Sequence, residues 1–319
     1  MRDAVRGRKR LKKHELVGFV FNMLQDEYEQ SDAPALEHVA IPVERILRQL
    51  ASISEQPRRS SRWVFTQLRR YEEEHGTRLF RKFRGRHGEE MLQLTSALVS
   101  FLQKKHLHVA EKIRVANGVL DKLHSVAEEH PASATLRLAL GAGTTVHHLA
   151  EAMVRRPGLQ CHVVTHNLGV LEVLSRAHLP GVTVEAPGGR VDSVTYALVG
   201  GENGPYSAYP FDMIVQGTTA VYGGELFIES EVELERKQTV LHGTSGTRAL
   251  VLTLNEFAAE RPSTMHRFGS LADYDYLVLP ASRDTRRAKR RAEAALVSCE
   301  GNFEPEIIGW HYRILRRRS

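Results

Sequence analysis

One stretch of the chain, residues 136–153, strongly constrains how the second half of the sequence can fold. An apolar run from Leu136 to Leu140 ends in Gly141-Ala-Gly143, two threonines follow, and a helical pattern of apolar residues begins at once. That order predicts a strand, a tight loop and the N-terminus of a helix. Backbone N–H groups, two hydroxyls and the positive end of a helix dipole then meet at one point, which suits an anion such as a phosphate.

The loop residues match neither of two common nucleotide-binding motifs, and they do not identify a ligand. A nucleotide-binding P-loop would continue with Lys-Ser or Lys-Thr, and a dinucleotide fingerprint would carry a third glycine. Neither feature follows Gly141. An anion site at Gly141, Gly143, Thr144 and Thr145 is therefore one interpretation, and a Gly-rich turn without a ligand is the other.

Strand and helix patterns alternate through residues 131–282, which we take as one domain. Further strands are predicted at residues 161–165, 182–185, 211–216, 248–253 and 274–279, and a helix at residues 168–177. Such alternation is typical of an α/β domain with an open, mostly parallel sheet covered on both faces. Ligands of these sheets bind outside the carboxyl ends of the strands, where the Gly141–Thr145 loop is expected.

Composition excludes several other classes of protein. The chain has 319 residues, of which 42% are hydrophobic and 26% charged, as in folded globular domains. No apolar run approaches the length of a membrane span, and the basic residues up to Lys13 lead into no signal-peptide core. Cys161 and Cys299 lie far apart, with no partner at zinc-ligand spacing. We expect a cytoplasmic protein without disulfides, metal, other cofactor or membrane contact.

The net charge of +6 is concentrated toward the two ends of the chain, which indicates that one end meets a polyanion. In residues 1–91, helices are predicted at 16–24, 39–53 and 62–75, followed by a basic hairpin at 78–88. This order is typical of a winged helix–turn–helix, here predicted as an all-α module with a wing. Its third helix would enter the major groove of DNA.

The third predicted helix has signals at both ends and two distinct faces. Ser60 and Ser61 are candidate N-caps, and Gly76 stands where a C-terminal glycine is expected. Val64, Leu68 and Tyr71 form an apolar stripe. The residues expected to contact DNA are Arg58, Arg59, Ser60, Ser61, Arg62, Arg69, Arg81, Lys82, Arg84 and Arg86. Pairing of the arginines with the following glutamates on a solvated helix is the alternative.

Residues 56–81 resemble the DNA-binding domain of LysR-type regulators. Gln56-Pro-Arg-Arg-Ser-Ser-Arg62 is similar to the Ser-Gln-Pro-Ala-Leu-Ser turn of that family. The segment from Gln67 to Arg81 is similar to its recognition helix, which ends in Leu-Glu-Glu-Glu-Leu-Gly, and to its Leu-Phe-x-Arg wing. The resemblance implies sequence-specific DNA binding.

An amphipathic pattern runs from Leu92 to Glu129. It predicts a linker helix within residues 92–130 that pairs with a second copy, as in LysR-type regulators, and hence a homodimer or higher homo-oligomer. A helix that lies on its own sensor domain is the alternative. Residues 283–319 are expected to form a solvated basic tail.

The second half of the chain resembles the C-terminal sensor domain of DeoR-type repressors. The motifs are Gly143-Thr-Thr145, Val164-Thr-His-Asn167, Pro187-Gly-Gly-Arg190, Ala197-Leu-Val-Gly200, and Phe211-Asp212 followed by Gly217. The resemblance implies a ribose-5-phosphate isomerase-like fold and a phosphorylated sugar or related anionic metabolite as effector. It assigns effector binding to Gly141, Gly143, Thr144, Thr145, Thr165, Asn167, Gly189, Arg190, Gly217 and Lys237.

The sequence departs from this family where acids are expected. Gly141-Ala142 replaces Asp-Ser, His166 stands inside the Thr-Asn-Asn triplet, and Gly217-Thr-Thr-Ala220 lacks the acid of Gly-Ala-Asp-Gly. The phosphate loop is thus kept while the contacts to sugar hydroxyls have changed. A phosphorylated ligand of another type and a vestigial pocket kept for dimerisation are the two interpretations.

We expect a regulator and not an enzyme, and assign no catalytic residue. An isomerase needs a carboxylate base over its substrate. The alternating glutamates of residues 229–235 could line a strand, but a solvated helix or edge is commoner. His147-His148 is not expected to bind metal, because adjacent helical residues point apart. The alternatives are a sugar-phosphate isomerase-like enzyme with a basic appendage, and a complete LysR-type regulator.

Overall fold

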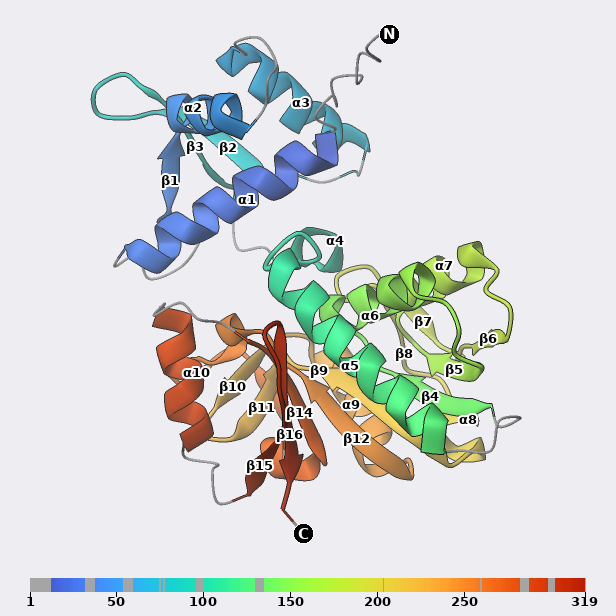
Figure 1. The fold of residues 1–319 in the computed structure, drawn as a ribbon. Coiled ribbons are helices and arrows are strands. Elements are labelled where there is room, and N and C mark those ends of the chain that lie inside the picture. The colour runs from blue at the N-terminus through green and yellow to red at the C-terminus, as the bar shows by residue number, and fades with distance from the viewer. Residues whose placement is uncertain are drawn as a thin grey trace, which may run out of the picture. The chain divides into compact units, whose positions relative to one another are not determined.

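A computed structural model shows two domains, residues 1–108 and residues 109–319 (Figure 1). It describes residues 13–31, 38–53, 60–74, 76, 78–95, 100–129, 135–202, 204–258, 260–281, 287–297 and 302–318. Among these residues, no helix is both long and apolar enough to cross a membrane.

The N-terminal domain packs its three longer helices, α1 to α3, on an antiparallel sheet with strand order β1-β3-β2, and also contains the short helix α4. Its elements are α1 (Lys13–Gln30), β1 (Ala40–Pro42), α2 (Val43–Ile53), α3 (Ser61–Glu74), β2 (Phe80–Arg84), β3 (Glu90–Leu94) and α4 (Phe101–Lys104). All three helices and the sheet contribute to one core, with Phe21, Ile46, Leu68 and Leu92 among its buried side chains. The prediction of an all-α module is therefore corrected: the domain also contains a three-stranded sheet.

Helix α3 forms where its local signals predict it. The Ser60 hydroxyl accepts a hydrogen bond from the Trp63 backbone N–H at 3.2 Å, so Ser60 acts as the N-cap. The predicted apolar stripe of α3 is buried. Gly76 follows the helix with φ +58°, a left-handed conformation that glycine adopts without strain.

Residues 90–94 form strand β3, where the sequence predicts helix. Leu92 and Leu94 are buried on one side of the strand, and Leu92 pairs with Ile41 of β1 and Lys82 of β2. Two-residue alternation and the neighbouring strands decide the conformation here. The helix predicted within residues 92–130 is shorter, and begins at Val109.

An eight-stranded sheet forms the centre of the C-terminal domain, with strand order β15-β16-β14-β12-β9-β4-β5-β6. Its strands are β4 (Leu136–Leu140), β5 (Cys161–Thr165), β6 (Val182–Glu185), β9 (Phe211–Gly217), β12 (Gly246–Val251), β14 (Tyr276–Pro280), β15 (Phe303–Ile308) and β16 (Tyr312–Arg317). The strands from β6 to β14 are parallel, and β16 and β15 add antiparallel to β14. The mostly parallel sheet predicted from the sequence is confirmed.

Helices cover both faces of this sheet. One face carries α5 (Val109–Glu129), α6 (Thr144–Arg155) and α7 (Leu168–Ala177), and the other carries α8 (Gly204–Ala208) and α9 (Glu231–His242). The remaining elements are β7 (Arg190–Asp192), β8 (Ala197–Val199), β10 (Ala220–Tyr222), β11 (Glu225–Ile228), β13 (His266–Ser270), α10 (Arg287–Val297), and the 3-10 helices η2 (Leu254–Glu256) and η3 (Leu271–Asp273). Strands β7 and β8 form a separate hairpin.

Helix α5 lies on the sheet of its own domain. Val115, Val119 and Leu123 are buried in the core that α5 shares with α6, β14 and β16. This is the arrangement that the sequence left as the alternative to pairing with a second copy. Dimerisation stays a prediction, and it would need a surface other than this apolar face.

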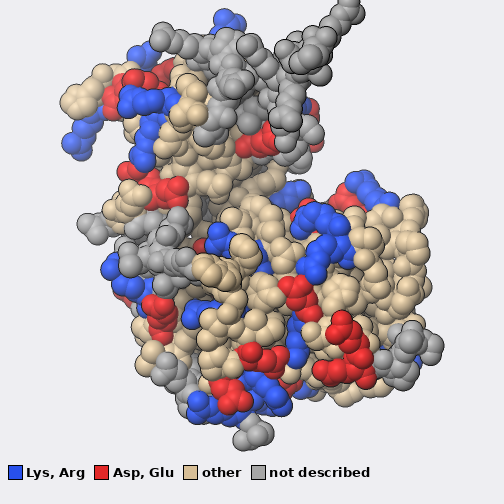
Figure 2. All heavy atoms as spheres, viewed as in Figure 1, with Lys and Arg blue, Asp and Glu red and all other residues tan. Residues whose placement is uncertain are grey.

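The prediction of a solvated basic tail fails for residues 303–317. Residues 287–297 form helix α10, whereas strand β16 pairs with β14, and Ile314 on it is fully buried. The basic residues that follow Ile314 hide the strand pattern in the sequence, because Arg316 and Arg317 are exposed. Arg317 lies 2.9 Å from Asp275, and Figure 2 shows basic side chains next to acidic ones over this region.

Candidate functional site

The large sheet reverses its strand order between β4 and β9. From β4 the chain adds β5 and β6 on one side, then returns to β9 and adds β12 and β14 on the other. Ligands of open α/β sheets bind at such a reversal, outside the carboxyl ends of the strands. Gly141 ends β4 there, and its N–H donates to the Val215 carbonyl of β9 at 2.8 Å. A Cβ on Gly141 would lie 3.1 Å from Gln216 Cγ, so glycine allows the close approach.

Helix α6 begins at this edge with an open N-terminus. Gly143 is its N-cap at φ +122°, and no side chain of the described residues caps the first-turn N–H groups. Thr144 and Thr145 begin the helix, and Thr145 is buried. Uncapped N–H groups and the positive end of the helix dipole favour an anionic oxygen. The predicted order of strand, loop and helix is confirmed, and the anion stays a prediction.

Asn167 and Thr165, both predicted to bind effector, hold this loop in place. Asn167 Nδ2 donates to the carbonyls of Gly141 at 3.3 Å and Gly143 at 3.0 Å, while Oδ1 accepts from the first-turn N–H groups of α7. Thr165 Oγ1 donates to the Leu140 carbonyl at 2.6 Å. Because both ends of the Asn167 amide are engaged within the protein, its role in the structure is to position the loop.

Lys237, predicted as an effector contact, reaches the same edge from α9. The side chain is 3% exposed, and its Nζ donates to the carbonyl of Gly217 at the end of β9. Glu233 Oε1 lies 3.9 Å from Nζ. Burial lowers the pKa of Lys237, and the carboxylates of Glu233 and Glu256 oppose that shift. The structure thus brings Gly217 and Lys237 together, and adds a buried cation to the sheet edge.

Arg236, next to Lys237, was not among the predicted site residues. Its buried guanidinium donates to the carbonyls of Gly188, Gly200 and Glu202, which ties the β7–β8 hairpin to α9. The sequence analysis singled out residues on both sides of Arg236, the acidic run 229–235 and Lys237, but not Arg236 itself, because its carbonyl partners lie more than thirty positions away in the chain.

The two predicted residues of the β7–β8 hairpin, Gly189 and Arg190, have different environments. Gly189 has φ +149°, and a Cβ on it would lie 2.9 Å from the carbonyl oxygen of Gly200. Gly189 therefore permits the closure of the hairpin. Arg190 is exposed on β7. Effector contact by either residue stays a prediction.

His166 is the second residue that was missed. It is fully buried after β5, and its Nδ1 lies 2.7 Å from the Tyr206 hydroxyl. Nε2 has no hydrogen-bond partner among the described residues. Burial, and to a smaller extent the positive charges of Lys237 and Arg236, lower the pKa of His166 to about 3. The signal in the sequence was the departure from Thr-Asn-Asn at this position.

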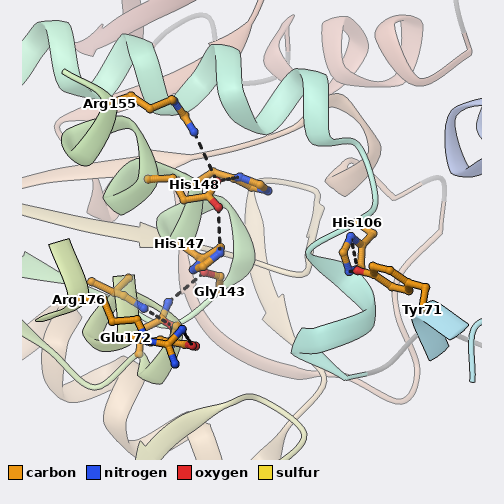
Figure 3. Close-up of polar contacts among 12 residues, drawn as sticks. Tyr71, His106, Gly143, His147, His148, Arg155, Glu172 and Arg176 are labelled. Carbon is orange, nitrogen blue, oxygen red and sulfur yellow. Dashed lines mark hydrogen bonds and ion pairs between the residues drawn. The ribbon is translucent and has the colours of Figure 1, made fainter. Parts of the chain in front are cut away.

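His147 and His148 converge on one carboxylate, although adjacent helical residues were expected to point apart. His148 Nδ1 lies 2.7 Å from Glu151 Oε2, and His147 Nε2 lies 3.6 Å from Glu151 Oε1. Figure 3 shows His147, His148 and Arg155 of this helix. Arg155 also pairs with Glu151. The described residues contain no group of three or more side chains placed to hold a metal ion. The cluster is an ion-pair network on α6.

The ion pairs of Glu151 should make the free energy of unfolding depend on pH in the acid range. The pKa of Glu151 is lowered to about 2, first by the hydrogen bond from His148 and then by the charges of His148, His147 and Arg155, against the effect of burial. Because the folded-state pKa lies below the ordinary value, the carboxylate stabilises the fold above pH 4.5. This contribution is lost as the pH falls through about 2. Since Glu151 is partly exposed, we expect about 1 kcal/mol.

Urea unfolding of the wild type and Glu151→Gln at pH 7, 4 and 2 tests this prediction. The difference between the two proteins should be largest at pH 7 and vanish near pH 2. Glu172→Gln is the matched control, because Glu172 pairs with the exposed Arg176 on α7 at 2.8 Å. A constant difference across this pH range would contradict the assignment.

The acidic residues at 229–235 do not line a strand. Residues from Glu231 onward form helix α9, with Glu231 and Glu235 exposed and Glu233 buried beside Lys237. The commoner interpretation of this run, a solvated helix, holds for its exposed members. A row of carboxylates over a substrate is therefore absent from the described residues of this segment.

Helix α3 presents the arginines predicted to contact DNA. Of these, Arg62 and Arg69 are exposed on the side opposite the buried stripe, and so is Arg70, which was not among the predicted contacts. Ser60 caps the helix, and Ser61 hydrogen-bonds Glu90 through its side chain. Arg58 and Arg59 lie outside the described residues.

The predicted wing residues are exposed, although some have partners. Lys82 pairs with Glu90 and lies 4.2 Å from the Phe65 ring centroid, and Arg81 donates to Gln93 at 2.7 Å. Arg84 donates to the Gly88 carbonyl at 3.3 Å, and Arg86 is exposed in the turn. The face drawn in Figure 2 shows basic and acidic side chains interspersed on this domain.

The segment after the hairpin is anchored to α3. His106 contacts the Tyr71 hydroxyl through Nε2, and its ring stacks on Phe21 with centroids 6.2 Å apart (Figure 3). Burial raises the pKa of Tyr71 to about 12, so the hydroxyl keeps its proton. The last residues before Val109 are thus attached to the helix that carries the arginines.

Comparison with known proteins concerns mainly the C-terminal domain. Residues 133–280 match the DeoR C terminal sensor domain. No curated protein sequence matches the chain. Ribose 5 phosphate isomerase A from Neisseria gonorrhoeae is 13% identical over 66% of this chain and 76% of its own, with a TM-score of 0.32. The eIF2B beta subunit from Chaetomium thermophilum is 14% identical over 84% and 79%, with a TM-score of 0.33.

Proposed function

We propose that this protein is a DNA-binding transcriptional regulator whose C-terminal domain senses a phosphorylated sugar or a similar anionic metabolite. The match of residues 133–280 to the DeoR C terminal sensor domain carries the proposal. That segment contains the open N-terminus of α6 and the buried Lys237 at the same sheet edge. A phosphate oxygen would find backbone donors and a favourable dipole there.

The DNA-binding half of the proposal rests on the N-terminal domain. Its order of elements, α1-β1-α2-α3-β2-β3, is the order of a winged helix–turn–helix, and α3 would be the recognition helix. Arg62, Arg69 and Arg70 on the exposed side of α3 would meet DNA. We propose that the regulator binds as a homodimer, so that two such helices contact one operator.

Fluorescence anisotropy of the purified protein with labelled DNA from its own upstream region tests the function. Binding that scrambled DNA does not remove at physiological salt supports a sequence-specific regulator. A panel of sugar phosphates added to the same sample would then change the anisotropy if the domain is a sensor. Equal competition by scrambled DNA, or no binding, would contradict the regulator.

Thr144→Val is expected to weaken effector binding at least tenfold without unfolding the protein. The substitution removes a hydroxyl at the first position of α6 and keeps the shape of the side chain. One charge-assisted hydrogen bond to a phosphate contributes about 1.5–3 kcal/mol, which corresponds to tenfold or more. Calorimetry with the active sugar phosphate measures the change. Unchanged affinity would argue against the Gly141–Thr145 loop as the phosphate site.

An aldose–ketose isomerase is the second candidate, favoured by the buried Glu233–Lys237 pair at the sheet edge. A buried carboxylate next to a cation is a possible base and charge stabiliser for proton transfer. Turnover of ribose 5-phosphate by the purified protein would support it. Such activity should be unaffected by Arg62→Ala, since Arg62 is an exposed residue of the other domain.

A further inference from the structure

The His166 imidazole carries a buried nitrogen that the described protein does not satisfy. The side chain lies between Thr165 and Asn167 at the carboxyl edge of the sheet, and Nε2 has no hydrogen-bond partner among the described residues. An unpartnered buried polar group costs about 1–3 kcal/mol. Its neighbour Asn167 is tied to both Gly141 and Gly143 of the loop. This unsatisfied nitrogen is an observation independent of the α6 N-terminus, and an atom of a bound ligand would satisfy it.

The contacts of Tyr206 decide which imidazole nitrogen carries the proton. The Tyr206 hydroxyl oxygen accepts the backbone N–H of His166 at 3.1 Å, and the hydroxyl has one hydrogen to donate. The structure gives it no acceptor among the described residues other than His166 Nδ1, at 2.7 Å. Nδ1 is therefore the acceptor. In the neutral imidazole the proton is then on Nε2, which makes this nitrogen a donor.

The surroundings of His166 keep its imidazole neutral and are positively charged. Burial and the cations Lys237 and Arg236 lower its pKa to about 3. The carboxylate of Glu233 lies at this edge, 3.9 Å from Lys237, but it is not among the groups that shift the pKa of His166. Neither the Gly141–Thr145 loop nor residues 217–219 contain an acid. The charges that act on His166 therefore favour an anionic group of a ligand over a neutral one.

We propose that His166 Nε2–H recognises a carboxylate of the effector, which makes the effector a phosphorylated carboxylic acid and not a phosphorylated polyol or aldose. This inference rests on the proposed function, in which the phosphate binds at α6. A hydroxyl group must also find an acceptor when it is buried, whereas a carboxylate only accepts. Lys237 next to His166 adds the positive charge that a second anionic group requires.

Calorimetry with matched phosphorylated probes tests the proposal on the full chain. The first pair is 6-phosphogluconate and glucose 6-phosphate, and the second is 3-phosphoglycerate and glycerol 3-phosphate, with inorganic phosphate as reference. The wild type should bind the acid of at least one pair tenfold or more tightly than its partner. Phosphate alone should bind more weakly than that acid.

Two variants of His166 separate recognition from folding. The amide nitrogen of His166→Gln can occupy the position of Nε2, whereas that of His166→Asn falls short of it. We expect His166→Asn to reduce the preference for the acid to less than threefold and His166→Gln to restore most of it, with phosphate binding unchanged in both. A preference that survives in His166→Asn, or equal binding of acid and partner by the wild type, would overturn the inference and leave the proposed function standing. Failure of every probe to bind would overturn both.

The tautomer can be measured without any ligand. In protein labelled with 15N-histidine, long-range proton–nitrogen correlation should show His166 protonated at Nε2 and unchanged between pH 7 and pH 5. Loss of the signals in His166→Asn assigns them. A proton on Nδ1, or titration of this residue near pH 6, would overturn the inference.

Discussion

The Asn167→Ala variant is expected to lose about 2–4 kcal/mol of unfolding free energy and most of its affinity for an anion. The Asn167 side chain is fully buried, and its two ends hold two different elements. Oδ1 caps α7, and such a cap contributes about 1 kcal/mol. Nδ2 satisfies the carbonyls of Gly141 and Gly143, and buried carbonyls that lose their partner cost about 1–3 kcal/mol. The loop would also lose the bonds that hold its N–H groups in one orientation.

Urea unfolding followed by circular dichroism measures this loss, and calorimetry measures the anion affinity. Asn167→Asp separates the two roles, because a carboxylate still caps α7 but faces the carbonyls of Gly141 and Gly143 without a donor. It should retain the cap contribution and still lose anion affinity. Ser230→Ala is the matched control: Ser230 is the N-cap of α9 and its side chain makes no capping bond. A change below about 0.5 kcal/mol in Asn167→Ala, which is the scatter of surface substitutions, would contradict the tethering role.

The order of β4, loop and α6 could be predicted because it depends on neighbouring residues. Apolar residues from Leu136 to Leu140, two glycines and two threonines carry the signal within one short segment, and the structure has β4 and α6 there. The cap at Ser60 and the glycine at position 76 are local for the same reason. Features of this kind depend on backbone preferences that each residue expresses by itself.

Features that depend on distant contacts were missed. Ile314 is buried only because β16 pairs with β14, and the surrounding arginines conceal the strand. The importance of His166 depends on Tyr206, which lies forty positions along the chain. Likewise, Leu92 belongs to a strand because Ile41 and Lys82 flank it. The pattern of apolar residues in a short segment carries no information about such distant partners.

The double variant Arg62→Ala/Arg69→Ala is expected to raise the Kd for specific DNA at least a hundredfold at physiological salt. Both side chains are exposed on α3 and away from its buried stripe, so the fold should be unaffected. A dimer would lose four positive charges, and the slope of log affinity against log salt should become less negative by about 3–4. We expect a wild-type slope of about −7, from roughly eight neutralised phosphates.

Anisotropy titrations at several salt concentrations measure the affinity and the slope together. Arg176→Ala is the matched control, because Arg176 is likewise an exposed helical arginine, lies in the other domain and pairs with Glu172. It should leave both quantities unchanged. Arg69→Lys separates attraction to phosphates from recognition of a base. Lysine keeps the positive charge, so the slope of log affinity against log salt should not change, but it cannot form the bidentate hydrogen bonds that arginine makes with guanine. If the double variant binds upstream DNA as the wild type does, α3 is not the recognition helix. If it loses scrambled and upstream DNA equally, its arginines supply attraction without specificity.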